Sequence, residues 1–570
     1  MKLDTFFDNF SLLADAPHGV QKLRETILQL AVQGKLVPQN PKDEPASVLL
    51  EKIQAEKERL VKEKKIKKIK LLPPINPEKT PYEVPDSWEW TRLTEIGLIN
   101  PRNDVGNEAE VSFVPMKLVP TILGDRVESE IRQWGDIKNG FTHFAEGDVA
   151  IAKITPCFQN RKSAVMRGLK NGLGAGTTEL HIFRPVKKLI IPDYVLLYLK
   201  TPKFIREGVS KMTGSAGQKR VPKSYFSETP FPLPPINEQK RIVAKVDELM
   251  SLCDELEARK QQVSKNCIQL NDASIHKLLT AHEPKKFNKH WQRIYGSFDL
   301  LYSKPENVNK LRQAVLQLAV QGKLVRQDPK DEPASVLLEK IKADKEKLIK
   351  EGKIKKPKSL PPIDPNEVPY ELPRRWEWTR LGHVLNKLTD GTHHSPPNDS
   401  IGDYMYITAK NIKSEGVSLE DVTYVSKKKH KEIFTRCDVE FGDILYIKDG
   451  ATTGVATINT LEEQFSMLSS VALLKPPKML YNRFLLYLLR SPYYYSLMRE
   501  GMSGVAITRV TLTKLNNSLI PLSPLPEQKR IVAKVDELMA LCDELETRLS
   551  QSQTDCDRLM EAAVAEILAA

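Results

Sequence analysis

The chain lacks the short motifs that mark most enzymes acting on nucleotides or nucleic acids. It contains no GxxxxGK loop followed by Ser or Thr, so we do not expect it to hydrolyse nucleoside triphosphates. Ser395-Pro-Pro-Asn398 is the nearest approach to an amino-methyltransferase loop, but it lacks both the leading acid or amide and the closing aromatic residue. The glycine run Gly172–Gly176 follows no strong strand and is typical of a loop rather than a cofactor cradle. We therefore expect no catalytic residue and no bound cofactor on this chain.

Cysteine is scarce, and nothing in its arrangement favours a metal or a disulfide. The six cysteines include no CxxC. Cys253 and Cys267 are 14 residues apart, as are Cys542 and Cys556, and two heptads place each pair on one stripe of a helix. His393-His394 has no third ligand at a metal-like spacing. We predict core packing for the cysteines and no metal site.

Long apolar runs are also absent. The stretch Leu189–Leu199 is interrupted by Pro192 and Asp193, so it cannot span a bilayer. The first residues, MKLDTFFDNFSLLADAP, show no basic region followed by an apolar stretch, as a secretory signal would. The expected setting is the cytoplasm.

The most informative feature that is present is a duplication. Leu23–Ile53 returns at Leu311–Ile341 with 26 of 31 residues identical. Glu238–Glu257 returns at Glu527–Glu546 with a single difference. Between these blocks the two copies share only a few anchors. A constant frame around two divergent inserts indicates a scaffold that presents two different binding domains.

Length and charge agree with a multidomain binding protein. At about 150 residues per domain, 570 residues allow three or four domains. The net charge of +13 favours an anionic partner, with nucleic acid as the first choice. A basic surface that is merely solvated explains the same charge equally well.

Two long helices follow the inserts. In the first, apolar residues alternate in steps of four and three, with Lys260 as the only break, and the second repeats the pattern. Four heptads of such a seam predict a coiled coil. The natural partner of each helix is its equivalent in the other copy, arranged antiparallel by a pseudo-two-fold; the alternative is one-sided packing against each insert. The seam positions are Ile242, Val246, Leu249, Cys253, Leu256, Val263, Cys267 and Leu270, and then Ile531, Val535, Leu538, Cys542, Leu545, Leu549, Cys556 and Leu559.

Each copy also has a lysine-rich run and a proline-rich linker before its insert. The runs 56–70 and 344–358 are typical of solvated helix ends, with contact to phosphate or a partner as the alternative. The linkers lead to Trp88-Glu-Trp90 and Trp376-Glu-Trp378, whose indoles we expect to pack the insert onto its linker.

The inserts share a skeleton of short strands and helices, so the predicted class is mixed α/β: two globular domains separated by long antiparallel helices in a pseudo-two-fold repeat. Gly147-Asp148 and Gly442-Asp443 each lead an apolar strand that ends in a lysine. The predicted divisions are a helical block at 1–80, a first variable domain at 81–232, a central scaffold at 233–360 with a helix over about 238–280, a second variable domain at 361–521, and a final helix at 522–570.

Loops that leave the shared strands are the best candidates for binding nucleic acid. Amide side chains pair bidentately with adenine, guanidinium groups with guanine, and lysines neutralise phosphate. A solvated polar loop is the alternative at each position. The candidates are Lys153, Thr155, Gln159, Asn160, Arg161, Lys162, Ser215, Gln218, Lys219 and Arg220 in the first domain, and Thr392, His393, His394, Lys448, Thr452, Thr453, Ser503, Thr508 and Arg509 in the second.

Taken together, these blocks resemble the specificity subunit of type I restriction–modification enzymes over nearly the whole chain. The resemblance rests on the duplicated LQLAVQGKLV and EQKRIVAKVDEL blocks, the PYEVP-x-x-WEW and PYELP-x-x-WEW entries, and the GDV and GDI strands. It implies two target-recognition domains, each reading one half of a split double-stranded DNA site, with the long helices setting the unspecific spacer between the halves.

The same resemblance implies partners that carry the chemistry. Two methyltransferase subunits would bring S-adenosylmethionine and methylate adenine N6, and motor-nuclease subunits would use ATP and Mg to cut unmodified DNA. Two other interpretations remain open. One is a structural coiled-coil adaptor that never contacts bases, and the other is the DNA-binding part of a self-contained modification enzyme.

Overall fold

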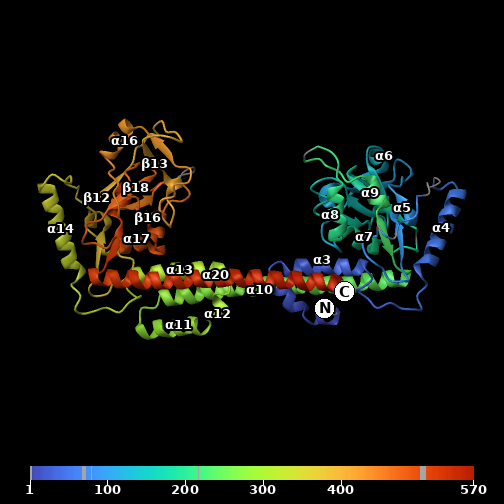
Figure 1. The fold of residues 1–570 in the computed structure, drawn as a ribbon, viewed down its shortest axis with the longest axis horizontal. Helices are drawn as coiled ribbons and strands as arrows, with labels where there is room; N and C mark the ends of the chain where they lie inside the picture. The colour runs from blue at the N-terminus through green and yellow to red at the C-terminus, as the bar shows by residue number, and fades with distance from the viewer. Residues whose placement is uncertain are drawn as a thin grey trace. The chain divides into compact units, whose positions relative to one another are not determined.

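The computed structural model describes residues 3–66, 72–76, 78, 80–186, 188–215, 217–357, 359–500 and 509–569. The chain forms two compact units: unit 1 comprises Met1–Val263 and Ser552–Ala570, and unit 2 comprises Ser264–Gln551. The two longest helices, α10 (Ile236–Leu279) and α20 (Leu525–Ala569), each begin in one unit and contribute their last residues to the other (Figure 1). The predicted mixed α/β class and internal repeat are confirmed.

In unit 1 the helix α3 (Gly19–Val32) runs antiparallel to the first part of α10. Arg24 pairs with Asp254 across the two helices (Nη2–Oδ1 2.5 Å), and farther along the chain Gln39 Nε2 donates to Glu238 Oε1 (2.6 Å). The contacts advance along the chain from α3 while they go back along α10, so the two helices run in opposite directions.

The end of α20 completes the bundle of unit 1. Lys22 pairs with Glu561 (3.2 Å), and Lys35 Nζ donates to Leu568 O (2.7 Å), so α20 runs parallel to α3 and therefore antiparallel to α10. Ile567 of α20 belongs to the same buried cluster as the α10 seam. The predicted antiparallel pairing of the two long helices is thus confirmed within unit 1.

Unit 2 repeats this bundle with the roles of the long helices exchanged. Arg312 of α13 (Pro305–Val320) pairs with Asp543 of α20 (2.5 Å), and Lys323 Nζ donates to Leu279 O of α10 (2.9 Å). Each unit therefore needs the end of the other copy's long helix to close its bundle.

The remaining scaffold helices are short and lie before the variable domains. In unit 1 they are α1 (Leu3–Asp8), α2 (Phe10–Asp15) and α4 (Ala46–Lys62). In unit 2 they are α11 (Pro284–Gly296), α12 (Phe298–Leu301) and α14 (Ala334–Lys350).

The variable domain of unit 1 contains two four-stranded sheets and a two-stranded ribbon. One sheet has the order β2-β9-β6-β7 and is antiparallel throughout; the other has the order β4-β3-β8-β5 with β3 and β8 parallel. The strands are β1 (Glu89–Arg92), β2 (Gly97–Ile99), β3 (Glu110–Val114), β4 (Glu130–Gln133), β5 (Thr142–Ala145), β6 (Val149–Ala152), β7 (Ser163–Val165), β8 (Leu173–Gly176), β9 (Leu180–Pro185) and β10 (Pro230–Leu233). The helices are α5 (Leu93–Ile96), α6 (Trp134–Ile137), α7 (Pro192–Lys200), α8 (Pro202–Ser210) and α9 (Lys223–Glu228).

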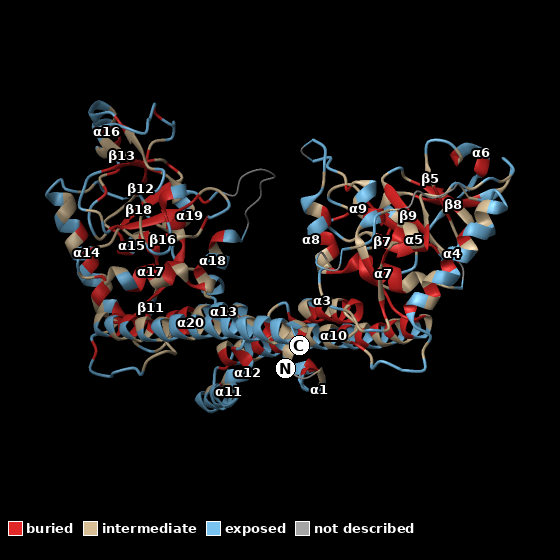
Figure 2. Cartoon of the chain, turned by 45° about the vertical axis from the view of Figure 1, so that its right-hand side comes forward, coloured by how far each residue is buried: buried red, intermediate tan, exposed pale blue. Residues whose placement is uncertain are grey.

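The variable domain of unit 2 keeps the first sheet and the ribbon but has a smaller second sheet. The orders are β12-β18-β15-β16 and β14-β13-β17, and β11 pairs with β19. The strands are β11 (Glu377–Arg380), β12 (Lys387–Asp390), β13 (Tyr404–Ile407), β14 (Thr423–Val425), β15 (Ile444–Ile447), β16 (Ala456–Ile458), β17 (Ser466–Met467), β18 (Val471–Lys475) and β19 (Leu519–Leu522). The helices are α15 (Leu381–Val384), α16 (Lys427–Phe434), α17 (Asn482–Arg490), α18 (Pro492–Arg499) and α19 (Leu512–Asn517). Figure 2 shows buried residues concentrated in these sheets and in α7 and α17.

The repeated Gly-Asp pair begins the central strand of each domain. Gly147 and Gly442 have φ of +85° and +87°, a conformation that glycine adopts without steric cost. The following carboxylates close the turn, because Asp148 Oδ2 accepts from Ala145 N (2.7 Å) and Asp443 Oδ2 from Glu440 N (2.8 Å).

A buried glutamine at the start of each long helix ties the scaffold to its variable domain. Gln239 Oε1 accepts from Ile191 N (2.9 Å), just before α7, and Gln528 makes the equivalent bond to Tyr481 N (3.1 Å). Both glutamines are fully buried. The EQKR sequence is therefore the junction between helix and domain.

The tryptophans and the lysine-rich runs also connect the scaffold to the variable domains. Trp90 and Trp378 pack on the linker tyrosines, with ring centroids 5.2 and 5.0 Å from those of Tyr82 and Tyr370, which confirms the predicted linker packing. Within the described part of the lysine runs, Lys57 Nζ donates to Thr94 O (2.8 Å). Lys345 makes the equivalent contact with Gly382 O (3.0 Å). These two lysines hold α4 and α14 against the variable domains.

The predicted heptad seam holds over its first half, but beyond Lys260 only some of its positions are buried. Val263 and Leu270 are about half exposed and Leu559 is 69 % exposed, whereas Cys267 is buried. An α-helix has 3.6 rather than 3.5 residues per turn, so a strict heptad stripe drifts off the buried face. The break at Lys260 has a specific cause, because its Nζ donates to three carbonyls at the end of α2, including Ala14 O (3.1 Å) and Ala16 O (2.8 Å). Cys556 is exposed, whereas Cys253, Cys267 and Cys542 are buried as predicted.

Candidate nucleic-acid interface

Two of the predicted loops of unit 1 lie side by side. Thr155 N donates to Lys219 O (3.0 Å), and Thr155 Oγ1 donates to Gly217 O (3.2 Å). Val221 N donates to Lys153 O (2.8 Å). The loop after β6 and the loop before α9 therefore form one surface, although they are about sixty residues apart in the sequence.

This surface, which we call the unit 1 loop pair, carries most of the predicted contact residues of the first domain. Lys211 and Lys223, one at each end of the second loop, are exposed as well and were missed in the sequence. Their position on either side of a glycine-containing loop was the available signal. The exposed predicted residues are Gln159, Asn160, Ser215, Gln218 and Lys219.

Arg220 is held by a carboxylate instead of pointing freely to solvent. Its guanidinium donates to both oxygens of Glu179, with Nε–Oε2 at 2.9 Å and Nη2–Oε1 at 2.8 Å. This pairing lowers the pKa of Glu179 and raises that of Arg220. A base contact by Arg220 would have to share or break a bidentate ion pair.

Arg161 and Lys162 have partners within the protein in this structure, and their predicted contact with DNA stays a prediction. Arg161 Nη2 pairs with Glu25 Oε1 of α3 (2.6 Å), and Lys162 Nζ donates to Met116 O (2.8 Å). Both side chains therefore fasten the domain internally or to its scaffold. Buried Lys200 reinforces the same place by donating to Arg161 O (3.0 Å), and burial lowers its pKa to about 7.

In unit 2 the candidate loops converge on one buried carboxylate. Asp390, at the end of β12, is 2 % exposed and lies beside three nitrogen-bearing side chains. Arg436 Nη2 lies 2.5 Å from Oδ1, His393 Nε2 lies 3.4 Å from Oδ1, and Lys448 Nζ lies 3.5 Å from Oδ2. We call these four residues the Asp390 cluster. Arg436 and His393 are exposed, so the buried carboxylate holds two side chains that also reach solvent.

Arg436 was not predicted from the sequence. It follows α16 and lies more than forty residues from Asp390, and no shared anchor marks it. Only the fold brings it beside His393, whose Nε2 is 3.1 Å from Arg436 Nη2.

Two predicted residues of unit 2 have side chains inside the domain. Lys448 is 2 % exposed and lies between Asp390 and Asp449. Thr453 is equally buried, and its hydroxyl donates to Gly450 O (2.7 Å) within a turn. Their predicted contact with DNA stays a prediction.

The other predicted residues of unit 2 that the structure describes are at or near the surface. Thr392 Oγ1 donates to His394 O (3.0 Å), and Thr452 is exposed. Arg509 Nε lies 3.3 Å from Asp449 Oδ1. Ser503 and Thr508 lie outside the described residues.

The two candidate surfaces are built on the same backbone frame. Val510 N donates to Lys448 O (2.8 Å), as Val221 N does to Lys153 O in unit 1. Around this common bond the side chains differ, with amides and lysines in unit 1 and the Asp390 cluster in unit 2. One frame thus presents two different chemical surfaces.

Over the part of the chain that the structure describes, no group of three His, Cys, Asp or Glu side chains could hold a metal ion. Among the same residues, no helix is both long enough and apolar enough to cross a membrane.

The unit 1 loop pair should loosen on acidification because of His181. Its Nε2 donates to Val221 O (3.0 Å), and burial lowers the pKa of the imidazole to about 4. A depressed pKa favours the neutral ring in the folded state, so the stabilisation is complete above pH about 6.5 and is lost as the pH falls toward 4. We expect unit 1 to lose about 3 kcal/mol over that window, measured by urea unfolding at a series of pH values.

Glutamine at the same position separates this effect from general acid denaturation. His181→Gln keeps a donor for Val221 O but cannot take up a proton, so its unfolding free energy should fall less steeply between pH 6.5 and 4. His282→Gln, at an exposed histidine, should behave as the unchanged chain. Equal slopes for all three proteins would contradict the assignment to His181.

Comparison with known proteins decides the family. The model of the type I restriction modification DNA specificity domain matches residues 85–265 and 373–552, one match for each copy of the repeat. The chain belongs to the type I restriction–modification DNA specificity family. Both matches span a variable domain and the first part of the long helix that follows it.

Two relatives are similar over almost their full length. The chain is 44% identical to the EcoAI specificity subunit of Escherichia coli, over 96% of this chain and 94% of that one. It is 40% identical to the EcoEI specificity subunit of the same species, with the same coverage. A solved HsdS subunit from Thermoanaerobacter tengcongensis is 20% identical, covers 86% of this chain and 98% of its own, and has a TM-score of 0.44.

The family places the chain in a DNA-recognition role. It is a specificity subunit of a type I restriction–modification system with two target-recognition domains, and it is not itself the enzyme of that system. The predicted resemblance is therefore confirmed. The matched domain is described by its DNA specificity.

Proposed function

We propose that each target-recognition domain reads one half of a split double-stranded DNA site, through the unit 1 loop pair and the Asp390 cluster. The observation that carries this proposal is the common backbone frame with divergent side chains. A purely structural adaptor would not require different loops on two copies of one frame. Two readers with different targets require this difference.

The side chains suggest how the reading is divided. In unit 1, Gln218 supplies an amide suited to adenine, and Lys219 supplies a charge suited to phosphate. In unit 2, Arg436 and His393 offer donors to guanine or to the backbone, with Asp390 fixing their orientation. Base identity is thus read differently in the two halves.

Substitutions in the unit 1 loop pair should distinguish phosphate contacts from base contacts. Lys219→Ala should weaken binding to all duplexes about equally and reduce the slope of log affinity against log salt by about 1. Gln218→Ala should relax the preference at one base pair, by about 1–3 kcal/mol. Filter binding of the full chain at several salt concentrations measures both effects.

Lys277→Ala, at an exposed lysine of α10, is the matched control and should leave both quantities unchanged. The first experiment is to map adenine methylation in cells with and without this gene. A split methylated motif that disappears on deletion would identify the site, and Gln218→Ala should then alter only one half of it. Binding that shows no sequence-dependent component would favour the adaptor interpretation.

We further propose that the long helices set the spacer between the half-sites. Each helix is continuous over 44 or 45 residues, which corresponds to about 66 Å at 1.5 Å per residue. Inserting about seven residues, two helical turns, into both α10 and α20 should lengthen the unspecific spacer. The half-site sequences should stay as they were; methylation mapping that shows altered half-sites would contradict the spacer role.

The chemistry on DNA is assigned to partner subunits. We propose that two methyltransferase subunits supply S-adenosylmethionine and methylate adenine N6, and that motor-nuclease subunits supply ATP- and Mg-dependent cleavage, all in the cytoplasm. Support comes from the family and from the absence of the corresponding sequence motifs in this chain. Adenine methylation requires the base to be extruded from the duplex, so the recognition domains must accept distorted DNA.

A further inference from the structure

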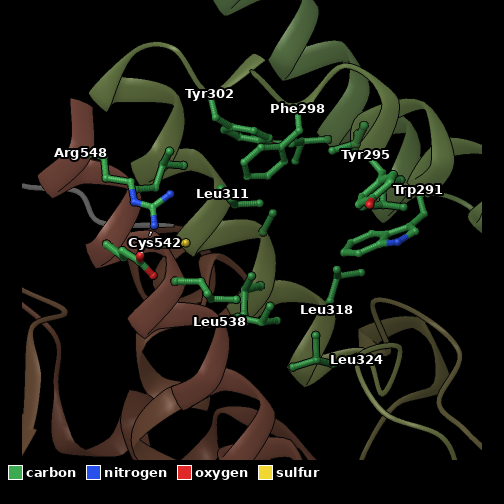
Figure 3. Close-up of a pocket in the computed structure, with 18 residues that line it drawn as sticks. Trp291, Tyr295, Phe298, Tyr302, Leu311, Leu318, Leu324, Leu538, Cys542 and Arg548 are labelled. Carbon is green, nitrogen blue, oxygen red and sulfur yellow. Dashed lines mark hydrogen bonds and ion pairs between the residues drawn. The ribbon is translucent and has the colours of Figure 1, made fainter. Parts of the chain in front are cut away.

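Unit 2 contains an apolar pocket of about 400 Å³ that the DNA-reading role does not use. Its outer wall consists of α11 and α12, and its floor consists of α13, α20 and the end of α10. Figure 3 shows Trp291, Tyr295 and Phe298 on one side of the opening, facing Leu318 and Leu538 on the other. The volume is in the range of cavities that bury a ligand, about 300–1,000 Å³.

Large apolar side chains at this pocket are left in contact with solvent. Tyr295 is 72 % exposed and Trp291 41 % exposed, and Leu541 is exposed as well. Clustered exposed aromatic and aliphatic side chains mark interaction sites more often than ordinary surface. The buried residues beneath them, such as Ile294 and Tyr302, form a cluster separate from the main core of unit 2.

The internal repeat provides the same floor in unit 1, where it is covered. Offsets of 288 and 289 residues align Leu318 with Leu30 and Leu538 with Leu249. In unit 1 these positions share one continuous cluster with Phe6 and Phe10 of the helices α1 and α2. Phe6 is completely buried.

The residue equivalent to Phe6 in unit 2 is Ile294, which is smaller, and the equivalent of Phe7 is the exposed Tyr295. The space that aromatic rings fill in unit 1 is thus left as the pocket in unit 2. The chain itself therefore shows what kind of group fits this floor: a phenyl ring carried by a short helix.

Charge indicates which helix would fit. The covering segment of unit 1, Leu3–Phe10, contains Asp4 and Asp8 and no basic residue. Helix α11, which forms the wall of the pocket, contains four lysines and arginines and no acidic residue over Pro284–Gly296. Opposite charges on the two surfaces steer and select the partner.

We propose that this pocket docks a short acidic helix of a partner protein, with a phenylalanine as the buried anchor. An amphipathic helix with aromatic anchors at positions i and i+4 is a recurrent ligand of such grooves. In unit 1 the rings of Phe6 and Phe10 fill the equivalent floor, whereas in unit 2 the equivalent helices α11 and α12 carry Ile294 in place of Phe6 and leave the pocket. Within the described residues, the two scaffold copies therefore differ at this floor.

A peptide with the sequence of Leu3–Leu13 serves as the probe, because it carries the chemistry that fills the equivalent floor of unit 1. Fluorescence anisotropy of the labelled peptide with the full chain should show saturable binding. Ile294→Phe, which restores the aromatic residue found in unit 1, should weaken it at least tenfold (~1.4 kcal/mol). Leu12→Phe, which adds the same ring at an exposed position of unit 1, should leave it unchanged.

Two further peptides test the stated chemistry. Replacing the three phenylalanines of the probe by alanine should abolish binding, and replacing both aspartates by lysine should weaken it most at low salt. Circular dichroism of Ile294→Phe checks that the variant is folded.

Three results would overturn the proposal. They are the absence of saturable binding, equal binding to Ile294→Phe, and binding that is indifferent to the phenylalanines. Sedimentation supplies a fourth: concentration-dependent dimerisation that Ile294→Phe abolishes would assign the pocket to a second copy of the chain.

Discussion

Replacing Asp390 by asparagine is expected to destabilise unit 2 by about 3 kcal/mol or more and to abolish selective binding at its half-site. The carboxylate and Lys448 are each 2 % exposed, so the substitution leaves a buried ammonium with one of its two carboxylate partners, Asp449 at 3.2 Å. Breaking a buried ion pair by removing one partner costs about 3–5 kcal/mol. Arg436 and His393 would lose the anion that orients them. Urea unfolding and binding to duplexes altered in one half measure the two effects.

Two further variants separate the effect of the lost Asp390 charge from other effects of the substitution. Asp390→Asn combined with Lys448→Met removes both charges and should recover most of the stability, but not the binding, because Arg436 stays unanchored. Glu440→Gln is the control, since the Glu440 side chain is 72 % exposed and Lys475 keeps Asp438 and Asp443 as partners, so the loss should be less than about 1 kcal/mol. Unchanged stability in Asp390→Asn would show that Asp449 alone compensates Lys448.

The fold was predictable from the sequence where local pattern and duplication agree. The helix expected over about 238–280 is Ile236–Leu279, and the Gly-Asp turns lead the central strands as expected. Beyond Lys260 the seam positions Val263 and Leu270 leave the buried face, because a heptad template ignores the drift of a 3.6-residue helix. In addition, the neighbours of α10 change along its length, from α3 to the elements of unit 2.

The candidate site was less predictable because its contacts are nonlocal. Residue type alone made Arg161 a candidate for DNA, whereas its partner Glu25 lies 136 residues earlier. A signal did exist: Glu25 is one of the five positions where the repeated block differs, and the second copy has Gln313 there. At Glu25 the difference between the two copies of the repeated block coincides with a contact between the scaffold and the variable domain.

The asymmetry of the two scaffolds should be measurable as a difference between two truncations. Phe6→Ala removes a fully buried ring that packs edge-on against Phe7 and Phe10, with centroids 5.5 and 6.2 Å apart. Such a truncation costs about 3–5 kcal/mol. Ile294→Ala, at the equivalent position of unit 2, should cost about 2 kcal/mol at most, because Ile294 already borders an empty pocket and has fewer contacts to lose.

Urea unfolding of both variants tests the comparison, and the peptide Leu3–Leu13 extends it. Phe6→Ala opens in unit 1 the floor that is open in unit 2, so this variant should bind a second equivalent of peptide. Equal costs for the two truncations would mean that α11 and α12 pack as tightly as α1 and α2. If Phe6→Ala alone lowers the unfolding free energy strongly and also creates a second peptide site, the two scaffold copies differ at this floor by the filling of one cavity. The duplicated helical scaffold would then be filled by its own side chains in unit 1 and left open to a partner protein in unit 2.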